Sequence, residues 1–214
     1  MTPTDETPEH GPSQPPVAQP PAAGATLPDR YFEDVYAASD DPWNFETSEY
    51  EHAKYARTLA ALPRGRYGRA LEVGCSIGVL TGLLADRAGH LLSVDVNGRA
   101  LARARERNRD RPNVTFERRR LPGQTPDGPF DLIVLSEVGY YLGAPDLERL
   151  LDELTERLAP GGDLILVHWT PPVPDYPLTG DGVHEAALRR TPGALIHRHG
   201  ERHDRYRLDV LGRP

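Results

Sequence analysis

The sequence predicts an α/β fold with a doubly wound, mostly parallel sheet of seven strands. Short apolar runs alternate with amphipathic helical patterns along the chain, and one of these runs ends in a glycine-punctuated turn at residues 74–78. Two polar strand patterns with a tight connection close the chain, and they are expected to add an antiparallel edge to the sheet.

Two helices are predicted before the first strand. The first begins near residue 29 and has Tyr36 on its apolar face, and the second follows the capping-box pattern Ser48-x-x-Glu51. The junction between them carries Trp43 and Phe45. It is expected either to close over a ligand as a lid or to attach the two helices to the sheet.

The elements after the turn repeat the alternation of strand and helix. Predicted strands are 91–96, 113–118, 130–136, 163–168, 194–200 and 204–211, and predicted helices are 98–108, 147–158 and 181–190.

Composition indicates one domain, residues 28–214. Residues 1–27 are rich in Pro, Ala, Gln and Ser and have almost no large apolar side chains, so this tail is expected to be disordered. An idle, solvated extension is favoured over a polyproline segment that binds a partner. The remaining residues suffice for one sizeable core, but not for a separate substrate domain as well.

Charge and cysteine content exclude several classes of protein. The net charge of −7 and the pI near 5.6 argue against a nucleic-acid partner. Cys75 is the only cysteine, so no intrachain disulfide and no zinc-type metal site are predicted. The chain has neither a secretory-type apolar leader nor a long apolar run, so we expect no membrane span and a cytoplasmic location.

The glycine turn predicts a ligand site. Gly74 is expected where the backbone needs a positive φ or approaches a ligand, and Gly78 where the next helix packs closely on the strand. Asp95 follows Gly78 by seventeen residues, at the end of the next apolar run. An acid at this place is suited to hold two ribose hydroxyls, so the ligand is expected to be a nucleoside.

The same turn indicates which nucleoside. Dinucleotide sites use G-x-G-x-x-G, whereas this turn has Gly74, Ser76 and Gly78 and no glycine two residues further on. Glu72 would repel a diphosphate, but it suits a ligand that carries an amine and a sulfonium. These features favour S-adenosylmethionine over a nicotinamide dinucleotide. The plain alternative is an ordinary turn with a surface acid.

Successive motifs resemble those of class I S-adenosylmethionine-dependent methyltransferases, a family with a Rossmann-like fold. They are Leu71-Glu72-Val73-Gly74-Cys75-Ser76-Ile77-Gly78, Asp95, Phe130-Asp131-Leu132-Ile133-Val134-Leu135-Ser136-Glu137 and Leu158-Ala159-Pro160-Gly161-Gly162. Two further stretches are similar to the NodS-like group, named for the rhizobial nodulation N-methyltransferase that acts on the free amine of a chitooligosaccharide. These are Asp41-Pro42-Trp43 with Ser48-Glu49-Tyr50-Glu51, and Ser136-Glu137-Val138-Gly139-Tyr140-Tyr141-Leu142.

The resemblance implies a set of donor contacts. The turn would contact the methionine part, Asp95 the ribose, and Ser136-Glu137 would form the floor between donor and acceptor. The expected cofactor-binding residues are Glu72, Gly74, Cys75, Ser76, Gly78, Asp95, Val96 and Ser136. Ser76 replaces the family's usual middle glycine, and the Pro-rich loop at residues 170–181 has no clear counterpart. This loop is expected to shape the acceptor site.

Methyl transfer requires alignment of a neutral nucleophile with the methyl group, so an amine acceptor must lose its proton by desolvation or to a base. Glu137 follows the fourth predicted strand, and His168 ends the fifth. These two residues are the first catalytic candidates, together with Tyr140. Their alternative roles are a helix cap, a donor-orienting group, a satisfied polar group at a strand end, or packing. Candidate acceptor-binding residues are Tyr36, Trp43, Tyr141, Trp169, Asp175 and His184.

Three functions remain open from the sequence. The favoured one is N-methylation of an amino sugar or another small polar acceptor, such as a natural product. The second is O-methylation of a small molecule, and the third is a noncatalytic donor-binding module that holds a partner. A homodimer is compatible with each of them.

Overall fold

The computed structural model describes residues 24–214. The predicted disordered tail therefore lies outside the described residues, except for its last four positions. Leu27, the final residue of that tail, is only 2% exposed, and its N–H donates to the carbonyl of Tyr141 at 2.8 Å. The packed part of the chain thus includes Leu27 and begins before residue 28.

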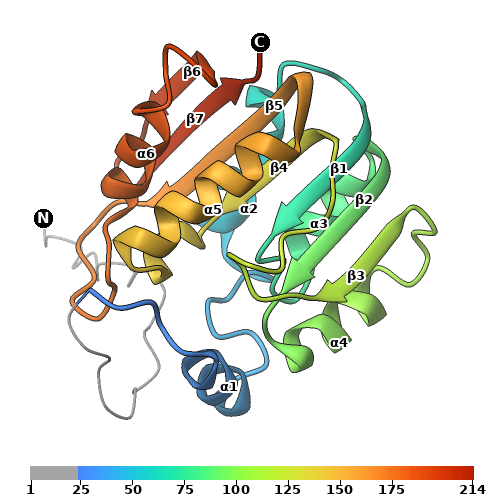
Figure 1. Cartoon of the computed structure of the whole chain (residues 1–214). Helices are drawn as coiled ribbons and strands as arrows, with labels where there is room; N and C mark the ends of the chain where they lie inside the picture. The colour runs from blue at the N-terminus through green and yellow to red at the C-terminus, as the bar shows by residue number, and fades with distance from the viewer. Residues whose placement is uncertain (1–23) are drawn as a thin grey trace, which may run out of the picture.

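One sheet of seven strands forms the centre of the molecule, with the order β3-β2-β1-β4-β5-β7-β6 (Figure 1). Strands β1 to β5 pair in parallel, and β7 runs antiparallel to both β5 and β6. The doubly wound sheet and its antiparallel edge are confirmed. The strands are β1 (Tyr67–Val73), β2 (Ala88–Asp95), β3 (Val114–Arg118), β4 (Phe130–Ser136), β5 (Leu158–Trp169), β6 (Ile196–Arg202) and β7 (Tyr206–Gly212).

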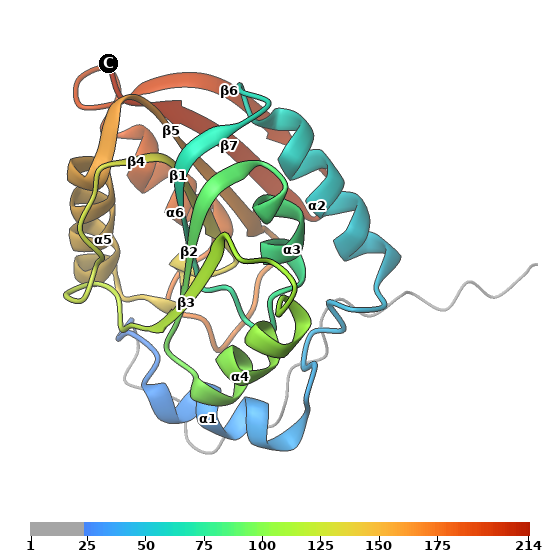
Figure 2. The same ribbon diagram turned by 90° about the vertical axis from the view of Figure 1, so that its right-hand side faces the viewer.

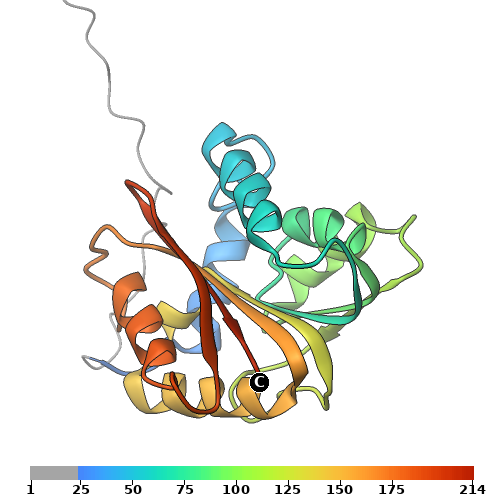
Figure 3. The same cartoon turned by 90° about the horizontal axis from the view of Figure 1, so that it is seen from above.

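Helices cover both faces of the sheet, as Figure 3 shows, with α2 and α3 on one face and α5 and α6 on the other. Successive side chains of a strand point to opposite faces, so each central strand contributes to two cores. Leu71 and Val73 of β1 pack with α5, whereas Ala70 packs with α2 and α3. The helices are α1 (Asp29–Ala38), α2 (Glu49–Ala61), α3 (Val79–Ala85), α4 (Gly98–Arg107), α5 (Ala144–Arg157) and α6 (Gly180–Leu188), with a 3₁₀ turn η1 (Gly139–Tyr141).

Helix α1 lies beyond the carboxyl ends of the central strands and next to α4 (Figure 2). Two ion pairs connect α4 to the segment between α1 and α2: Arg103 pairs with Asp40 and Arg107 with Glu46. Trp43 and Phe45 of this segment pack against Tyr36 and Ala100. The aromatic junction therefore attaches α1 and α2 to the body of the fold at the end of the sheet where ligands of doubly wound folds bind.

Candidate active site

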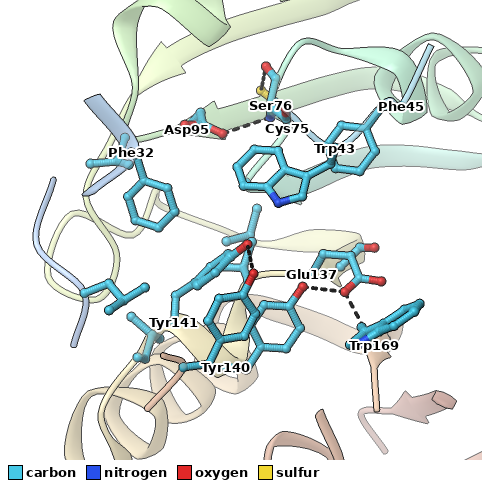
Figure 4. A pocket seen from close by; sticks show the side chains of 18 of the residues that line it. Phe32, Trp43, Phe45, Cys75, Ser76, Asp95, Glu137, Tyr140, Tyr141 and Trp169 are labelled. Carbon is cyan, nitrogen blue, oxygen red and sulfur yellow. Dashed lines mark hydrogen bonds between the residues drawn. The ribbon is translucent and has the colours of Figure 1, made fainter. Parts of the chain in front are cut away.

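A cavity of about 410 Å³ lies at the carboxyl ends of β1, β2 and β4 (Figure 4). Most of the residues predicted for the site line it. These are Tyr36, Trp43, Glu72, Gly74, Cys75, Ser76, Asp95, Val96, Ser136, Glu137, Tyr140, Tyr141 and Trp169. Gly78, His168, Asp175 and His184 are not part of this lining. One cavity thus joins the predicted donor turn to the residues that follow β4.

The turn after β1 depends on glycine at two positions, for packing reasons. Gly74 has φ +75°, and a Cβ there would lie 2.1 Å from Cγ2 of Val138. Gly78 has φ +79°, and its Cβ would lie 2.9 Å from Cα of Ala104. Gly78 therefore allows close packing of the turn on α4, and not of a helix on the strand as predicted. Ser76 adopts φ +50° without being a glycine.

Asp95 organises the turn from the end of β2. Its Oδ2 accepts a hydrogen bond from the N–H of Ser76 at 2.8 Å, and its Oδ1 accepts one from the N–H of Asn97 at 2.8 Å. Burial raises the pKa of the Asp95 carboxyl, and these backbone donors oppose the shift. Each carboxylate oxygen can accept a second hydrogen bond, so the group keeps capacity for ligand hydroxyls.

Glu72 of β1 is buried and lines the same cavity. Its Oε2 accepts from the hydroxyls of Thr81 at 2.6 Å and Ser93 at 2.7 Å. Burial raises the pKa of Glu72 to about 7, against the lowering effect of these two hydroxyls. Glu72 therefore changes its charge near neutral pH, beside the space predicted for a cationic ligand.

Three charged side chains form a buried cluster in the cavity wall, which we call the Glu51–Lys54–Glu137 cluster. Nζ of Lys54 lies 2.6 Å from Oε1 of Glu137 and 2.9 Å from both carboxylate oxygens of Glu51. The Lys54 side chain is 2% exposed. Burial lowers the pKa of Lys54, but the two carboxylates outweigh it and raise this pKa overall. Lys54 therefore stays charged.

Glu137 is held rigidly at the end of β4. It has φ +57°, and its Oε2 accepts from the hydroxyl of Tyr140 at 2.5 Å and from the N–H of Trp169 at 3.0 Å (Figure 4). Together with the ion pair to Lys54, these contacts give both of its carboxylate oxygens a partner. Glu137 and Tyr140, two of the three predicted catalytic residues, are thus brought together in the cavity.

Glu51 and Lys54 are site residues that the sequence analysis missed. Ser48 does cap α2, because its Oγ accepts from the N–H of Glu51 at 3.3 Å. The Glu51 carboxylate, however, turns to Lys54 instead of completing the capping box. The sequence feature that could have identified them is their spacing. Glu51 and Lys54 are three residues apart, on the same helix face as the buried Tyr55 and Thr58.

His168 lies behind the cavity wall, and the expectation that it projects into the crevice is wrong. Its Nε2 accepts from the N–H of Gly139 at 3.1 Å, and its Nδ1 lies 3.1 Å from Nε2 of His184. His184 Nδ1 in turn lies 2.7 Å from Oδ2 of Asp209. The physical reason is strand alternation: Trp169 faces the cavity, so its neighbour His168 points to the opposite face, towards α6.

Aromatic rings form much of the cavity wall around Glu137. Tyr140 stacks on Tyr176 with ring centroids 4.9 Å apart, and Trp43 stacks on Phe45 at 5.6 Å. Tyr176 comes from the Pro-rich loop and was not predicted individually, whereas the predicted Asp175 beside it is exposed and outside the lining. The loop thus shapes the cavity through Pro171 to Pro174 and Tyr176.

Residues 24–214 contain neither a helix suited to cross a membrane nor a cluster of side chains suited to hold a metal ion. No helix in this part of the chain combines the length and apolar character that a membrane crossing needs. The same residues contain no group of three or more His, Cys, Asp or Glu side chains placed to hold a metal ion.

Comparison with known proteins identifies the family. The family described as Nodulation protein S (NodS) matches residues 32–169. The chain belongs to the NodS family. Nodulation protein S of Rhizobium tropici is a NodS-family relative, 35% identical over 130 residues, which are 60% of this chain and 55% of the relative. The chain spans only about 55 to 62% of the length of three such relatives.

Solved structures agree with this assignment to the NodS family. A candidate methyltransferase from Pseudomonas syringae is 38% identical, has a TM-score of 0.69, and the match covers 78% of this chain and 100% of that one. The N-methyltransferase NodS from Bradyrhizobium japonicum WM9, in complex with S-adenosyl-L-homocysteine, has a TM-score of 0.76 at 24% identity, covering 86% and 97%. The Rossmann-like methyltransferase fold and the NodS-like resemblance are therefore confirmed.

Proposed function

We propose that this NodS-family chain is an S-adenosylmethionine-dependent methyltransferase that methylates an amino group of a small polar acceptor of the amino-sugar class. Family membership supports the reaction class, and the NodS structure with bound S-adenosyl-L-homocysteine supports the donor. The observation that carries the proposal is that a single cavity is lined both by the acid-flanked glycine turn and by the Glu51–Lys54–Glu137 cluster.

The donor end of the cavity has the chemistry that S-adenosylmethionine needs. Asp95 offers carboxylate oxygens for ribose hydroxyls, and the turn at Gly74 to Ser76 offers backbone. Buried Glu72 suits a positively charged ligand, because ionisation of this carboxyl becomes more favourable beside a cation. The turn lacks the glycines of a diphosphate cradle, which supports this donor over a dinucleotide.

The acceptor end favours an amine over a hydroxyl. The Glu51–Lys54–Glu137 cluster contains two carboxylates and one ammonium, so it carries one excess negative charge in a buried wall. A buried charge is costly without a partner, and a protonated amine would supply the missing positive charge. A neutral alcohol would leave this charge uncompensated. The aromatic walls at Tyr140, Tyr176 and Trp43 suit the face of a sugar ring.

The proposed reaction requires no covalent bond between the protein and the substrate. The bound donor supplies a methyl group already activated by its sulfonium. The chain's task is then to exclude water, to align the acceptor nitrogen, and to hold it in the neutral form. Tyr36 and Trp43 cover the cavity from the α1–α2 side, and Glu137 provides a fixed floor.

Calorimetry and mass spectrometry test the proposal. Titration with S-adenosyl-L-homocysteine is expected to give specific binding, and titration with NAD none. The full chain with S-adenosylmethionine is then offered amino sugars, chitooligosaccharides with a free amine, alkyl amines and matched alcohols. A gain of one methyl mass on an amine supports the proposal. Exclusive methylation of alcohols, or donor binding without methylation of any acceptor, would overturn it. The cytoplasmic location and the homodimer remain predictions.

A further inference from the structure

Glu51 has a carboxylate oxygen without a hydrogen bond. Among residues 24–214, Oε2 of Glu51 is buried and has no hydrogen-bond partner. Nζ of Lys54 lies 2.9 Å away, but it donates to Oε1 of the same carboxylate. Buried acceptors in folded proteins almost always have a donor, so an exception calls for an explanation. Glu51 lines the cavity, and a ligand can supply the missing donor.

The two carboxylates of the Glu51–Lys54–Glu137 cluster are not equivalent. Both oxygens of Glu137 are occupied, by Lys54 on one side and by Tyr140 and Trp169 on the other. Oε2 of Glu51 has no hydrogen bond, although it lies 2.9 Å from Nζ of Lys54, and the Glu51 side chain is more buried, at 6% exposed against 15% for Glu137. Proton uptake by Glu137 would break an established hydrogen-bond network, whereas proton uptake at Oε2 of Glu51 breaks no hydrogen bond and weakens only its ion contact with Lys54.

The surroundings of Glu51 make its carboxylate a stronger base than that of an exposed glutamate. Burial raises the pKa of Glu51, and Lys54 opposes the shift while Glu137 adds to it. Three titratable groups of its own helix, α2, face it: Tyr50, Lys54 and Tyr55. The fourth is Glu137, which follows β4. The pKa of each of these two tyrosines is raised by burial, so both are neutral at pH 7.

We propose that Glu51 binds the ammonium form of the acceptor through Oε2 and removes its proton. This role rests on the proposed N-methylation. The proton moves from the acceptor nitrogen to Oε2, and the nitrogen keeps the electron pair. That pair forms the bond to the methyl carbon, while the carbon–sulfur bond breaks and its electrons stay on sulfur. The product is an N-methylammonium ion, and Glu51 returns its proton to solvent after the product leaves.

Glu51→Gln tests the role, with Glu49→Gln as the matched control. Glu49 is also in the first turn of α2, but it is exposed and outside the cavity lining. The acceptor is the best amine found in the panel. We expect Glu51→Gln to lower kcat at pH 7 by about 100-fold or more, as for the loss of a general base. Affinity for S-adenosyl-L-homocysteine should change less than about threefold, and Glu49→Gln should match the wild type.

The pH profile separates a base from a merely structural residue. Without the base, only acceptor already deprotonated in solution reacts, so the rate of Glu51→Gln should rise tenfold per pH unit below the amine's pKa. The deficit against the wild type should therefore shrink from pH 7 to pH 10. A deficit that is constant with pH, or a rate equal to that of Glu49→Gln, would overturn the assignment.

The outcomes distinguish this inference from the proposed function. A wild-type chain that methylates no amine would refute the N-methyltransferase itself. A wild-type chain that does so, with an unaffected Glu51→Gln variant, would refute only the role of Glu51. If Glu51→Gln fails to fold, Glu51→Asp provides the same test, because it keeps the charge but withdraws the carboxylate. An intermediate loss of kcat that also shrinks at high pH is expected, and wild-type kcat would contradict the role.

Discussion

The hydroxyl groups of Tyr36 and Ser76 lie 2.5 Å apart, which joins α1 directly to the turn after β1. Both side chains line the cavity, and burial raises the pKa of Tyr36, so its hydroxyl is neutral. The residue that replaces the family's usual glycine in the turn is therefore also the one that attaches the N-terminal helix. A glycine at position 76 would leave Tyr36 without this partner.

Tyr36→Phe is expected to weaken donor binding. The change removes one hydrogen bond between α1 and the turn, whose net contribution is about 0.5 to 1.5 kcal/mol, or about two- to tenfold in affinity. Calorimetry with S-adenosyl-L-homocysteine measures the effect, with Tyr31→Phe on the same helix as the control, because Tyr31 is outside the cavity lining. Equal affinities of the two variants would show that the α1 contact does not support the turn.

Gly74→Ala is expected to destabilise the fold by about 2 to 4 kcal/mol. It adds the strain of a positive φ and a steric clash with Cγ2 of Val138. Val138→Ala in the same chain should recover part of this loss, because it removes the clashing methyl groups but not the strain. Urea unfolding of both single variants and the double variant measures the coupling. Simple additivity would contradict the predicted clash.

Glu72 should make stability depend on pH in a defined direction. Its folded-state pKa is about 7 against an ordinary value of 4.5, so the folded protein binds the proton more tightly. The associated stabilisation is complete below pH 4.5 and is lost as the pH rises through 7, by about 3 kcal/mol in total.

Glu72→Gln lacks this titration, so the wild type should lose stability relative to the variant between pH 4.5 and pH 8. Taking the difference between the two proteins in urea unfolding cancels the titration of other groups. Parallel curves for the two proteins would show that Glu72 ionises with its ordinary pKa. Bound donor should reduce the difference, because a cation beside Glu72 favours its charged form.

His184→Ala should lower stability without lowering donor affinity. The change leaves His168 and Asp209 each without one buried partner and creates a cavity under α6, at an expected loss of about 2 to 4 kcal/mol. Neither histidine lines the cavity, so S-adenosyl-L-homocysteine should bind the folded variant normally. Urea unfolding and calorimetry check the two effects. A selective loss of donor binding would mean that the histidines belong to the site.

Local sequence patterns were enough to predict the fold and to bring the turn residues and Asp95 to one end of the cavity. Short continuous apolar runs, separated by helical patterns, identify strands that are buried on both faces. The positions of Gly74 and Asp95 at the ends of two such runs follow from chain order alone. The carboxyl ends of adjacent parallel strands must meet at one edge, so these two residues had to come together. Boundaries were less accurate, as β5 begins at Leu158, within the predicted helix.

Tertiary structure decided which charged and polar side chains meet at the acceptor end. Glu51 follows a capping signal and Lys54 is an ordinary helix residue, yet Lys54 connects Glu51 to Glu137, which is 83 residues after Lys54. His168 was one position away from the cavity face, and the side it points to depended on strand register. The sequence alone determined the layers and the turn, because these follow from local periodicity and glycine spacing, and its motifs resemble those of the family. The placement of Glu51 and Lys54 depended on how α2 packs across the sheet, which local periodicity does not encode.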